Sequence, residues 1–287
     1  MDLAEIDRLT GGKLAPNGVD VPCPWCGPDR RSPANRRRPV LRIWRTDERF
    51  ATWSCARCGE AGYAAAAGRP VRVEVQEEAR AKAAEVQVKA RAERLELARW
   101  LWGRRQPIAG TPAERYLRHR GYDGPMPATL AYLPPRDDHP PAMIAAFGKA
   151  DEPESGVLEI DAANVRGVHI TRLAPDGSGK AGTDKDKIMI GHSAGWPIVL
   201  APMNDMLGLA IIEGIEKGLL LHEATGLGVW VAGAASRMPG LADKVPDYVD
   251  CLSVYSDDDN DGRRHATKLR DRLSARNIYA ELVIRRG

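Results

Sequence analysis

The sequence predicts a multidomain α/β protein, and three observations along its 287 residues support this prediction. Four of the five cysteines form two C-x-x-C pairs near the start of the chain, at 23–26 and 55–58. Residues 71–102 contain neither glycine nor proline, which is typical of a long helix. From residue 206 onward, apolar segments of strand type alternate with segments of helix type, and this pattern indicates a parallel sheet.

The cysteine pairs predict a zinc ribbon, a small β module, at 16–68. Each C-x-x-C turn places two thiolates on one side, and two such turns complete a tetrahedron around Zn²⁺. The chain starts without an apolar signal segment, so metal ligation is expected rather than disulfide formation. A lone fifth cysteine, Cys251, is expected to be a small buried apolar residue. The ligands of a structural zinc ion are therefore predicted to be Cys23, Cys26, Cys55 and Cys58.

The segment between the pairs predicts two strands around a turn at 46–48, because its residues alternate with a period of two. Residues 29–49 carry eight arginines and three acids, a local excess of +5, which suggests a polyanion partner. A solvated arginine-rich loop stays open as the alternative. Trp44, with Arg42 and Arg45 beside it, fits single-stranded nucleic acid, which needs stacking faces and phosphate partners. Some aromatic residues of the module must instead form its core.

Residues 71–105 predict a helical linker rich in alanine, glutamate, lysine and arginine. The pairs Glu78–Lys82 and Glu85–Lys89 have the i,i+4 order that supports an exposed helix.

A shorter helix is expected at the start of the next segment, 106–205. Thr111 would be its N-cap, Pro112 its first residue and Glu114 the partner in a capping box, with Gly121 ending the helix. The rest of this segment has short apolar runs separated by glycine and proline, so it is predicted to be a mixed, mainly β subdomain.

Acidic residues follow two predicted strands of the last segment, 206–287. Glu213 ends the apolar run "LGLAII", whereas Asp257 and Asp259 follow "CLSVYS". The carboxyl ends of parallel strands form ligand sites, and alternate residues of an extended segment point the same way. If the two strands are neighbours, the three carboxylates converge and suit Mg²⁺ and chemistry on phosphates.

The letters "DDDNDG" also match the first half of a calcium-binding loop. The match fails at the twelfth position, where Lys268 replaces the bidentate glutamate, and the preceding segment is strand-like. Magnesium is therefore favoured, with Asp261 as an additional candidate ligand. Asp258 is expected to point away, either hydrated or paired with Arg263 or Arg264.

Two further motifs are interpreted as turns. "GSGKA" at 177–181 lacks the first glycine and the final Ser/Thr of a phosphate-binding loop. "GHSAG" at 191–195 matches a nucleophile elbow, but a proline and a strand-like run follow it, so a hairpin turn is expected.

The stretches "AIIEGIEKGL", "VWVAGAA" and "SVYSDDDNDGRRHATKLRDRL" resemble the Toprim domain, which is shared by topoisomerases, bacterial-type primases and some nucleases. The motifs of that domain fall on Glu213-Gly214 and on Asp257-x-Asp259-x-x-Gly262. With a zinc ribbon at the N-terminus, the chain is similar to the DnaG-like primases of phages and mobile elements. Residues 106–205 resemble the upstream half of their polymerase core, though more loosely. Lys217 and Gly218 depart from the small or apolar residues that are more usual there.

The resemblance implies a DNA primase that makes short RNA primers from nucleoside triphosphates on single-stranded DNA. It implies Glu213 near the reacting phosphate, Asp257 and Asp259 as ligands of Mg²⁺ or Mn²⁺, and a replicative helicase acting in trans. A cytoplasmic location without a membrane span is also expected. In such primases a basic surface of the upstream half holds template and nucleotide, and the candidates here are Arg115, Arg118, Arg166, His169, Arg172, Lys180, Lys185 and Lys187.

Two other functions stay open. One is a recombination mediator that combines four cysteines with a Toprim domain and only binds DNA. The other is a Toprim nuclease, which would shorten a labelled strand rather than extend one. A topoisomerase is least expected, since no further domain is seen to carry an active tyrosine.

Overall fold

The computed structural model describes residues 1–28, 33–58, 60–66 and 73–285 of the chain. It forms two compact units, residues 1–90 and 91–287, and each is considered by itself. Part of the arginine-rich segment and the predicted boundary between module and linker lie outside the described residues. The side chains of residues 73–87 also lie outside the description, so the pairs Glu78–Lys82 and Glu85–Lys89 stay predictions.

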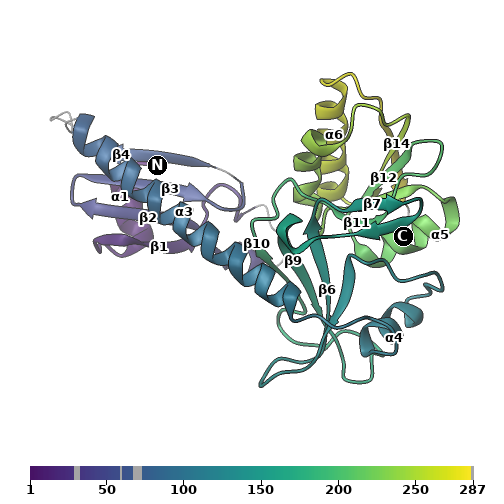
Figure 1. The fold of residues 1–287 in the computed structure, drawn as a ribbon. Helices are drawn as coiled ribbons and strands as arrows, with labels where there is room; N and C mark the ends of the chain where they lie inside the picture. The colour runs from purple at the N-terminus through teal and green to yellow at the C-terminus, as the bar shows by residue number, and fades with distance from the viewer. Residues whose placement is uncertain (29–32, 59, 67–72, 286–287) are drawn as a thin grey trace. The chain divides into compact units, whose positions relative to one another are not determined.

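The first unit contains a four-stranded antiparallel sheet in the order β1-β2-β3-β4 (Figure 1). The predicted hairpin is confirmed, because β2 pairs with β3 in antiparallel register. Ile6 of the N-terminal helix is fully buried in the core of this sheet, so the packed module extends beyond residues 16–68. The elements are α1 (Leu3–Thr10), β1 (Ala15–Pro22), α2 (Pro33–Arg37), β2 (Pro39–Asp47), β3 (Phe50–Cys55) and β4 (Ala61–Ala65).

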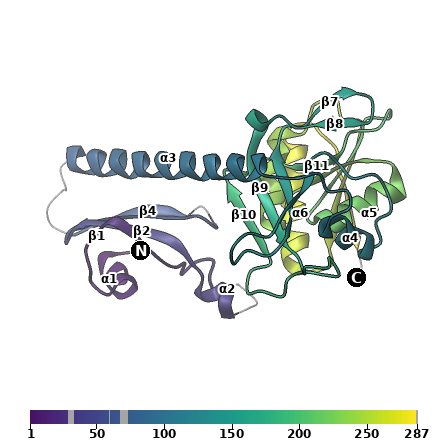
Figure 2. The same cartoon turned by 60° about the horizontal axis from the view of Figure 1, so that its bottom comes forward.

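The predicted long helix is confirmed as α3 (Val73–Gly103), whose last turns belong to the second unit. There Ala98 and Trp102 are buried against one face of a four-stranded antiparallel sheet in the order β10-β9-β6-β5. The strands are β5 (Leu130–Leu133), β6 (Ala142–Gly148), β9 (Val165–Arg172) and β10 (Lys187–Gly191). A separate hairpin of β7 (Asp151–Glu154) and β8 (Val157–Glu159) is labelled near the top of Figure 2, and the short helix η1 (Ala162–Asn164) follows it.

The short helix α4 (Pro112–His119) begins after Thr111 and ends before Gly121, as predicted. The capping box is wrong, however. The hydroxyl of Thr111 donates to the carbonyl of Ile108 at 2.6 Å instead of capping the helix, and Glu114 accepts from the backbone N–H of Gly110 at 2.7 Å.

The C-terminal sheet has the order β11-β13-β12-β14-β15, and the predicted parallel arrangement is confirmed for its last four members. Apolar residues alternate along β12, so that Ala210 and Ile212 pack with α5 whereas Leu209 and Ile211 pack with α6. The two helices therefore cover opposite faces (Figure 1). The elements are β11 (Ile198–Ala201), β12 (Gly208–Ile212), α5 (Ile215–Thr225), β13 (Gly228–Val231), η2 (Ala235–Lys244), β14 (Cys251–Asp257), α6 (Asn260–Ser274) and β15 (Glu281–Arg285).

Two expectations are corrected in this unit. The segment 191–195 is not a hairpin turn, because it joins β10 to β11, which belong to different sheets. Its Ser193 is buried and accepts a hydrogen bond from Arg237, which is a structural contact. Cys251 is exposed at the start of β14 rather than buried, since the apolar core begins only at Leu252.

Among the helices that the structure describes, none combines the length and apolar character needed to span a bilayer.

Candidate functional site

The four paired cysteines converge in the first unit. Cys23 and Cys58 have their Sγ atoms 3.8 Å apart, as do Cys26 and Cys55, and all four sulfur atoms lie within 4.8 Å of one another. Four sulfurs each about 2.3 Å from one zinc ion lie roughly 3.8 Å apart in a tetrahedron. Burial raises the pKa of the Cys26 thiol well above its usual value. The cluster fits a closed, structural Zn²⁺ site.

The nucleic-acid candidates of this module are mostly engaged inside it. Trp44 is 7% exposed, and its indole lies over Gly18, where an added Cβ would come 2.9 Å from Nε1. Arg45 is buried and pairs with Asp7 of α1. Arg42 is partly exposed but forms an ion pair with Asp20. These positions correct the expectation of a stacking platform on β2.

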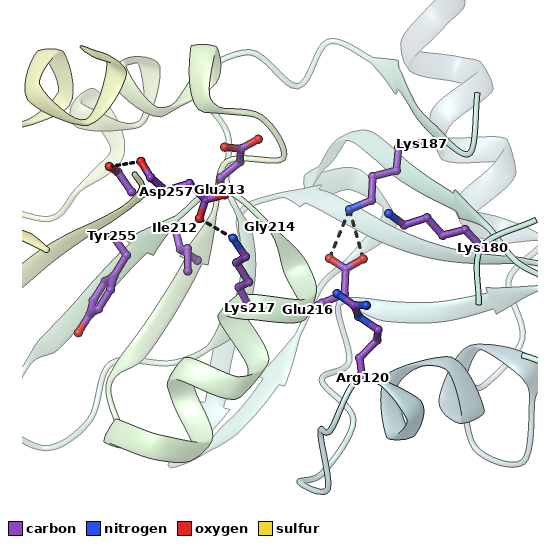
Figure 3. Close-up of a pocket in the computed structure, with 11 residues that line it drawn as sticks. Arg120, Lys180, Lys187, Ile212, Glu213, Gly214, Glu216, Lys217, Tyr255 and Asp257 are labelled. Atoms are coloured by element: carbon purple, nitrogen blue, oxygen red, sulfur yellow. Dashed lines mark hydrogen bonds and ion pairs between the residues drawn. The ribbon is translucent and has the colours of Figure 1, made fainter. Parts of the chain in front are cut away.

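The three predicted carboxylates are at one edge of the C-terminal sheet. Strands β12 and β14 are hydrogen-bonded neighbours in parallel register, with Ile211 opposite Val254, so both end at the same edge. Glu213 follows β12, and Asp257 is the last residue of β14. Asp259 is the N-cap of α6 and accepts the backbone N–H of Gly262 at 2.7 Å. The expected convergence of the two strand ends is thus observed (Figure 3).

The charges at this edge act on one another. Burial raises the pKa of Glu213, and the carboxylates of Asp257 and Asp259 raise it further. Lys217, in the first turn of α5, donates to Asp257 with Nζ 2.5 Å from Oδ1. The described residues contain one group of three or more ligand atoms within 4.8 Å, and that group is the cysteine cluster. The three carboxylates therefore lie at one edge of the sheet without forming a closed ligand shell, and their oxygen donors suit a hard divalent cation.

The neighbouring acids have other partners. Asp258 pairs with Arg263, which confirms that it turns away. Asp261 pairs with Arg264 at 2.8 Å.

A cleft of about 190 Å³ connects the acidic edge with a basic wall. Glu213 and Asp257 line one part of it, and Lys217 points toward Asp257 (Figure 3). The residues of the basic wall are Arg120, Lys180 and Lys187.

Glu216 contacts the basic wall through Lys187. Its side chain is nearly buried, accepts from the hydroxyl of Tyr116 at 2.7 Å and pairs with Lys187 at 3.2 Å. Burial alone would raise the pKa of Glu216, but Lys187 and the Tyr116 hydroxyl outweigh this effect and lower it to about 2. Glu216 therefore stays ionised and holds the ammonium group of Lys187 at the cleft.

Of the eight basic candidates in residues 106–205, Lys180 and Lys187 line the cleft. Arg115 and Arg118 hold backbone carbonyls around α4, and Arg166 binds a carbonyl and lies over the ring of Trp196. His169 is buried, and this burial lowers its pKa to about 4. Arg172 lines a different cavity, and Lys185 is exposed outside the cleft.

Sequence reasoning missed two residues of the cleft. Arg120 follows α4 directly, two residues after the candidate Arg118, so its basic character was visible although its direction was not. Glu216 lies three residues after Glu213, in the first turn of α5, and its burial was not foreseen. The departure at Gly218 has a packing reason, since a Cβ there would come 2.9 Å from Leu200 and 3.0 Å from Val231.

Comparison with protein families gives two matches. Residues 208–286 match the Toprim domain, and residues 92–200 match a domain of unknown function (DUF7146). A search of curated proteins found no match. Among solved structures, the chain is similar to the crystal structure of the Aquifex aeolicus primase (zinc binding and RNA polymerase domains). The identity is 13% and the TM-score 0.38, over 99% of this chain and 77% of that one, and this similarity carries no functional argument. The Toprim match confirms the domain expected at the C-terminus.

Proposed function

We propose that this chain is a Toprim-type DNA primase that joins ribonucleotides on a single-stranded DNA template. The observation that carries the proposal is the shared cleft. It brings Glu213 and Asp257, at the ends of neighbouring strands, to the same cavity as Lys180 and Lys187. A protein that only binds DNA has no need for carboxylates at this place, whereas nucleotidyl transfer needs both signs of charge.

The residues divide the work between the two sides of the cleft. Asp257 and Asp259, with Glu213 beside them, would hold Mg²⁺ or Mn²⁺, which supplies charge neutralisation for the phosphates and activates the attacking hydroxyl. The basic wall binds the triphosphate and orients it toward the carboxylates. A cavity of about 190 Å³ is smaller than ordinary pockets for whole ligands, so it suits the phosphates while sugar and base lie outside.

The rest of the chain is assigned to template handling. The division proposed is a zinc ribbon at 16–68, a linker at 71–105, an upstream primase subdomain at 106–205 and the Toprim domain at 206–287. Strand β11, within 106–205, pairs with β13, so the last two parts share one sheet. Replication of a phage, plasmid or mobile element, with a helicase in trans, is the setting that the sequence resemblance supports.

The test is a priming assay with the full chain, single-stranded DNA, labelled ribonucleotides and MgCl₂. The wild type is expected to make short RNA, and Asp257→Asn and Glu213→Gln are expected to make at least about a hundredfold less, since each removes charge at the reacting phosphate. Asp258→Asn is the matched control, because Asp258 pairs with Arg263.

Three outcomes would contradict the proposal. The first is no RNA from the wild type, and the second is undiminished RNA from Asp257→Asn. The third is metal-dependent shortening of a labelled DNA strand without incorporation, which would identify a nuclease. DNA binding that survives both substitutions, without any chemistry, would identify a mediator.

A further inference from the structure

A second cavity lies on the opposite face of the sheet that supports the basic wall. Along β10, Lys187 lines the catalytic cleft, whereas Ile188 and Ile190 line the other cavity, because successive side chains of a strand point to opposite faces. This cavity has a volume of about 410 Å³ and lies between the end of α3 and the sheet. We call it the α3 groove, and its apolar lining includes Leu97, Trp100, Leu133, Ile170, Ile188 and Ile190.

Trp100 gives the α3 groove an exposed aromatic face. Its side chain is 49% exposed, although most large apolar residues of the unit are buried. The guanidinium carbons of Arg104 and Arg136 lie 5.4 and 5.8 Å from the centre of its ring. A half-exposed indole with two guanidinium groups over its ring offers a base a stacking surface once the guanidinium groups turn to the phosphates.

The rim of the α3 groove is positively charged. Arg104, Arg136 and Arg172 line it, and Asp137 is the acid among its lining residues. Asp137 is 80% exposed and pairs with Arg136 at 3.4 Å. Among the described residues, no carboxylate forms an ion pair with Arg104 or with Arg172. The apolar floor of the α3 groove is complementary to nucleic-acid bases, and its arginine-rich rim is complementary to the phosphates that join them.

We infer that the α3 groove binds single-stranded nucleic acid, with a base stacked on Trp100 and phosphates against Arg104 and Arg172. An apolar peptide would fill the floor but would leave these guanidinium groups without anions, so the charges favour the nucleic acid. The site lies on the other face of the sheet from the catalytic cleft, so it would hold a strand segment separate from the one at Glu213. Binding there requires neither the carboxylates nor a divalent cation, and it extends beyond the proposed primase activity.

The test locates the strand and measures its affinity in one system. The full chain with Asp257→Asn, without divalent cations, is titrated with fluorescent oligo-dT, and a parallel oligonucleotide containing iodouracil is photocrosslinked and mapped by mass spectrometry. A crosslink at Trp100 is expected. Trp100→Ala is expected to weaken binding about tenfold, because it removes the surface on which one base stacks. Trp100→Phe is expected to restore most of it.

Arg172→Gln provides a second variant that leaves the apolar floor intact. It is expected to weaken binding and to lower the slope of log affinity against log salt by about one. Tyr279→Ala and Arg270→Gln are matched controls, since Tyr279 is 84% exposed and Arg270 is exposed on α6, far along the sequence. Both should bind as the parent chain does.

The inference is overturned if Trp100→Ala and Arg172→Gln keep the parent affinity and salt slope, or if crosslinks map only outside residues 97–190. Binding of apolar peptides at the groove with no crosslink to Trp100 would overturn it as well. Unchanged thermal unfolding of Arg172→Gln separates a lost contact from a lost fold.

Discussion

Lys217 Nζ lies 2.5 Å from Asp257 Oδ1, so the protein places an ammonium group of its own on one carboxylate of the sheet edge. Both side chains are about half exposed, at 50% and 41%, and an ion pair in such a setting contributes at most about 1 kcal/mol to stability. Its significance is electrostatic, because any divalent cation that uses Asp257 must compete with Lys217 or share the carboxylate with it.

Lys217→Met is expected to lower the concentration at which a divalent cation half-saturates the carboxylates of this edge. Removing the ammonium group leaves Asp257 without its competitor and increases the negative charge beside Glu213. Calorimetric titration with Mn²⁺, in the absence of nucleotide, should show severalfold tighter binding. Lys268→Met on α6 serves as the control, and a wild-type affinity in Lys217→Met would contradict the competition.

The basic wall is expected to determine nucleotide affinity. Lys180→Ala and Arg120→Ala should each raise the KM for ribonucleotides about tenfold or more, because a hydrogen bond to a charged group is worth about 1.5–3 kcal/mol. Lys185→Ala, on the same loop but outside the cleft, should leave KM unchanged. Steady-state kinetics at saturating template would show this, and equal effects of Lys180→Ala and Lys185→Ala would argue against the assignment.

Glu216 is expected to stabilise the fold in a pH-dependent way. Its pKa falls from the ordinary 4.5 to about 2 in the folded chain, so its contribution is complete above pH 4.5 and is lost as the pH falls toward 2. Glu216→Gln should therefore lower the free energy of unfolding by roughly 2–3 kcal/mol at pH 7.

The measurement for Glu216 is urea unfolding of both chains between pH 7 and pH 2.5. The gap between wild type and Glu216→Gln should narrow below pH 4.5, as protonation removes the charge from the wild type as well. Glu223→Gln, an exposed position of the same helix, should show no such gap. A gap that is constant with pH would disprove the role of the charge.

The cysteine cluster is expected to hold one zinc ion per chain. Cys55→Ser should lose the metal and unfold the first unit, since a structural zinc site supplies folding free energy directly. Elemental analysis and the near-ultraviolet circular dichroism of the module tryptophans would report both effects. Cys251→Ser should keep full zinc content, because Cys251 is exposed in the other unit and far from the cluster in sequence. Zinc retained by Cys55→Ser would refute the site.

The acidic edge could be predicted from sequence because its signals are local. Glu213 and Asp257 each end a run of apolar residues, and neighbouring parallel strands bring such ends together. The cysteine tetrahedron was equally local, since spacing alone aligns its thiolates. The convergence of the carboxylates also required that β12 and β14 be neighbours, and the structure supplies that pairing.

The sequence could not predict which basic residues line the catalytic cleft and which lie elsewhere. Arg172 and Lys187 lie on strands that pair with each other, yet they line opposite faces of the sheet, and a shift of one residue would have exchanged their roles. Trp44 and Arg45 were expected to face solvent, but Gly18 and Asp7 cover them from neighbouring elements. These outcomes depend on register and tertiary packing, which composition does not reveal.

The cap of α6 links the assembly of the metal edge to the folding of a helix. Because Oδ1 of Asp259 accepts the N–H of Gly262, the carboxylate is held in one rotation and its second oxygen has a fixed direction. A ligand held in advance loses little side-chain freedom when a cation arrives. Because this hydrogen bond also caps α6, fraying of the first turn of the helix would release the Asp259 carboxylate. The order of that first turn therefore reports whether the acidic edge is assembled.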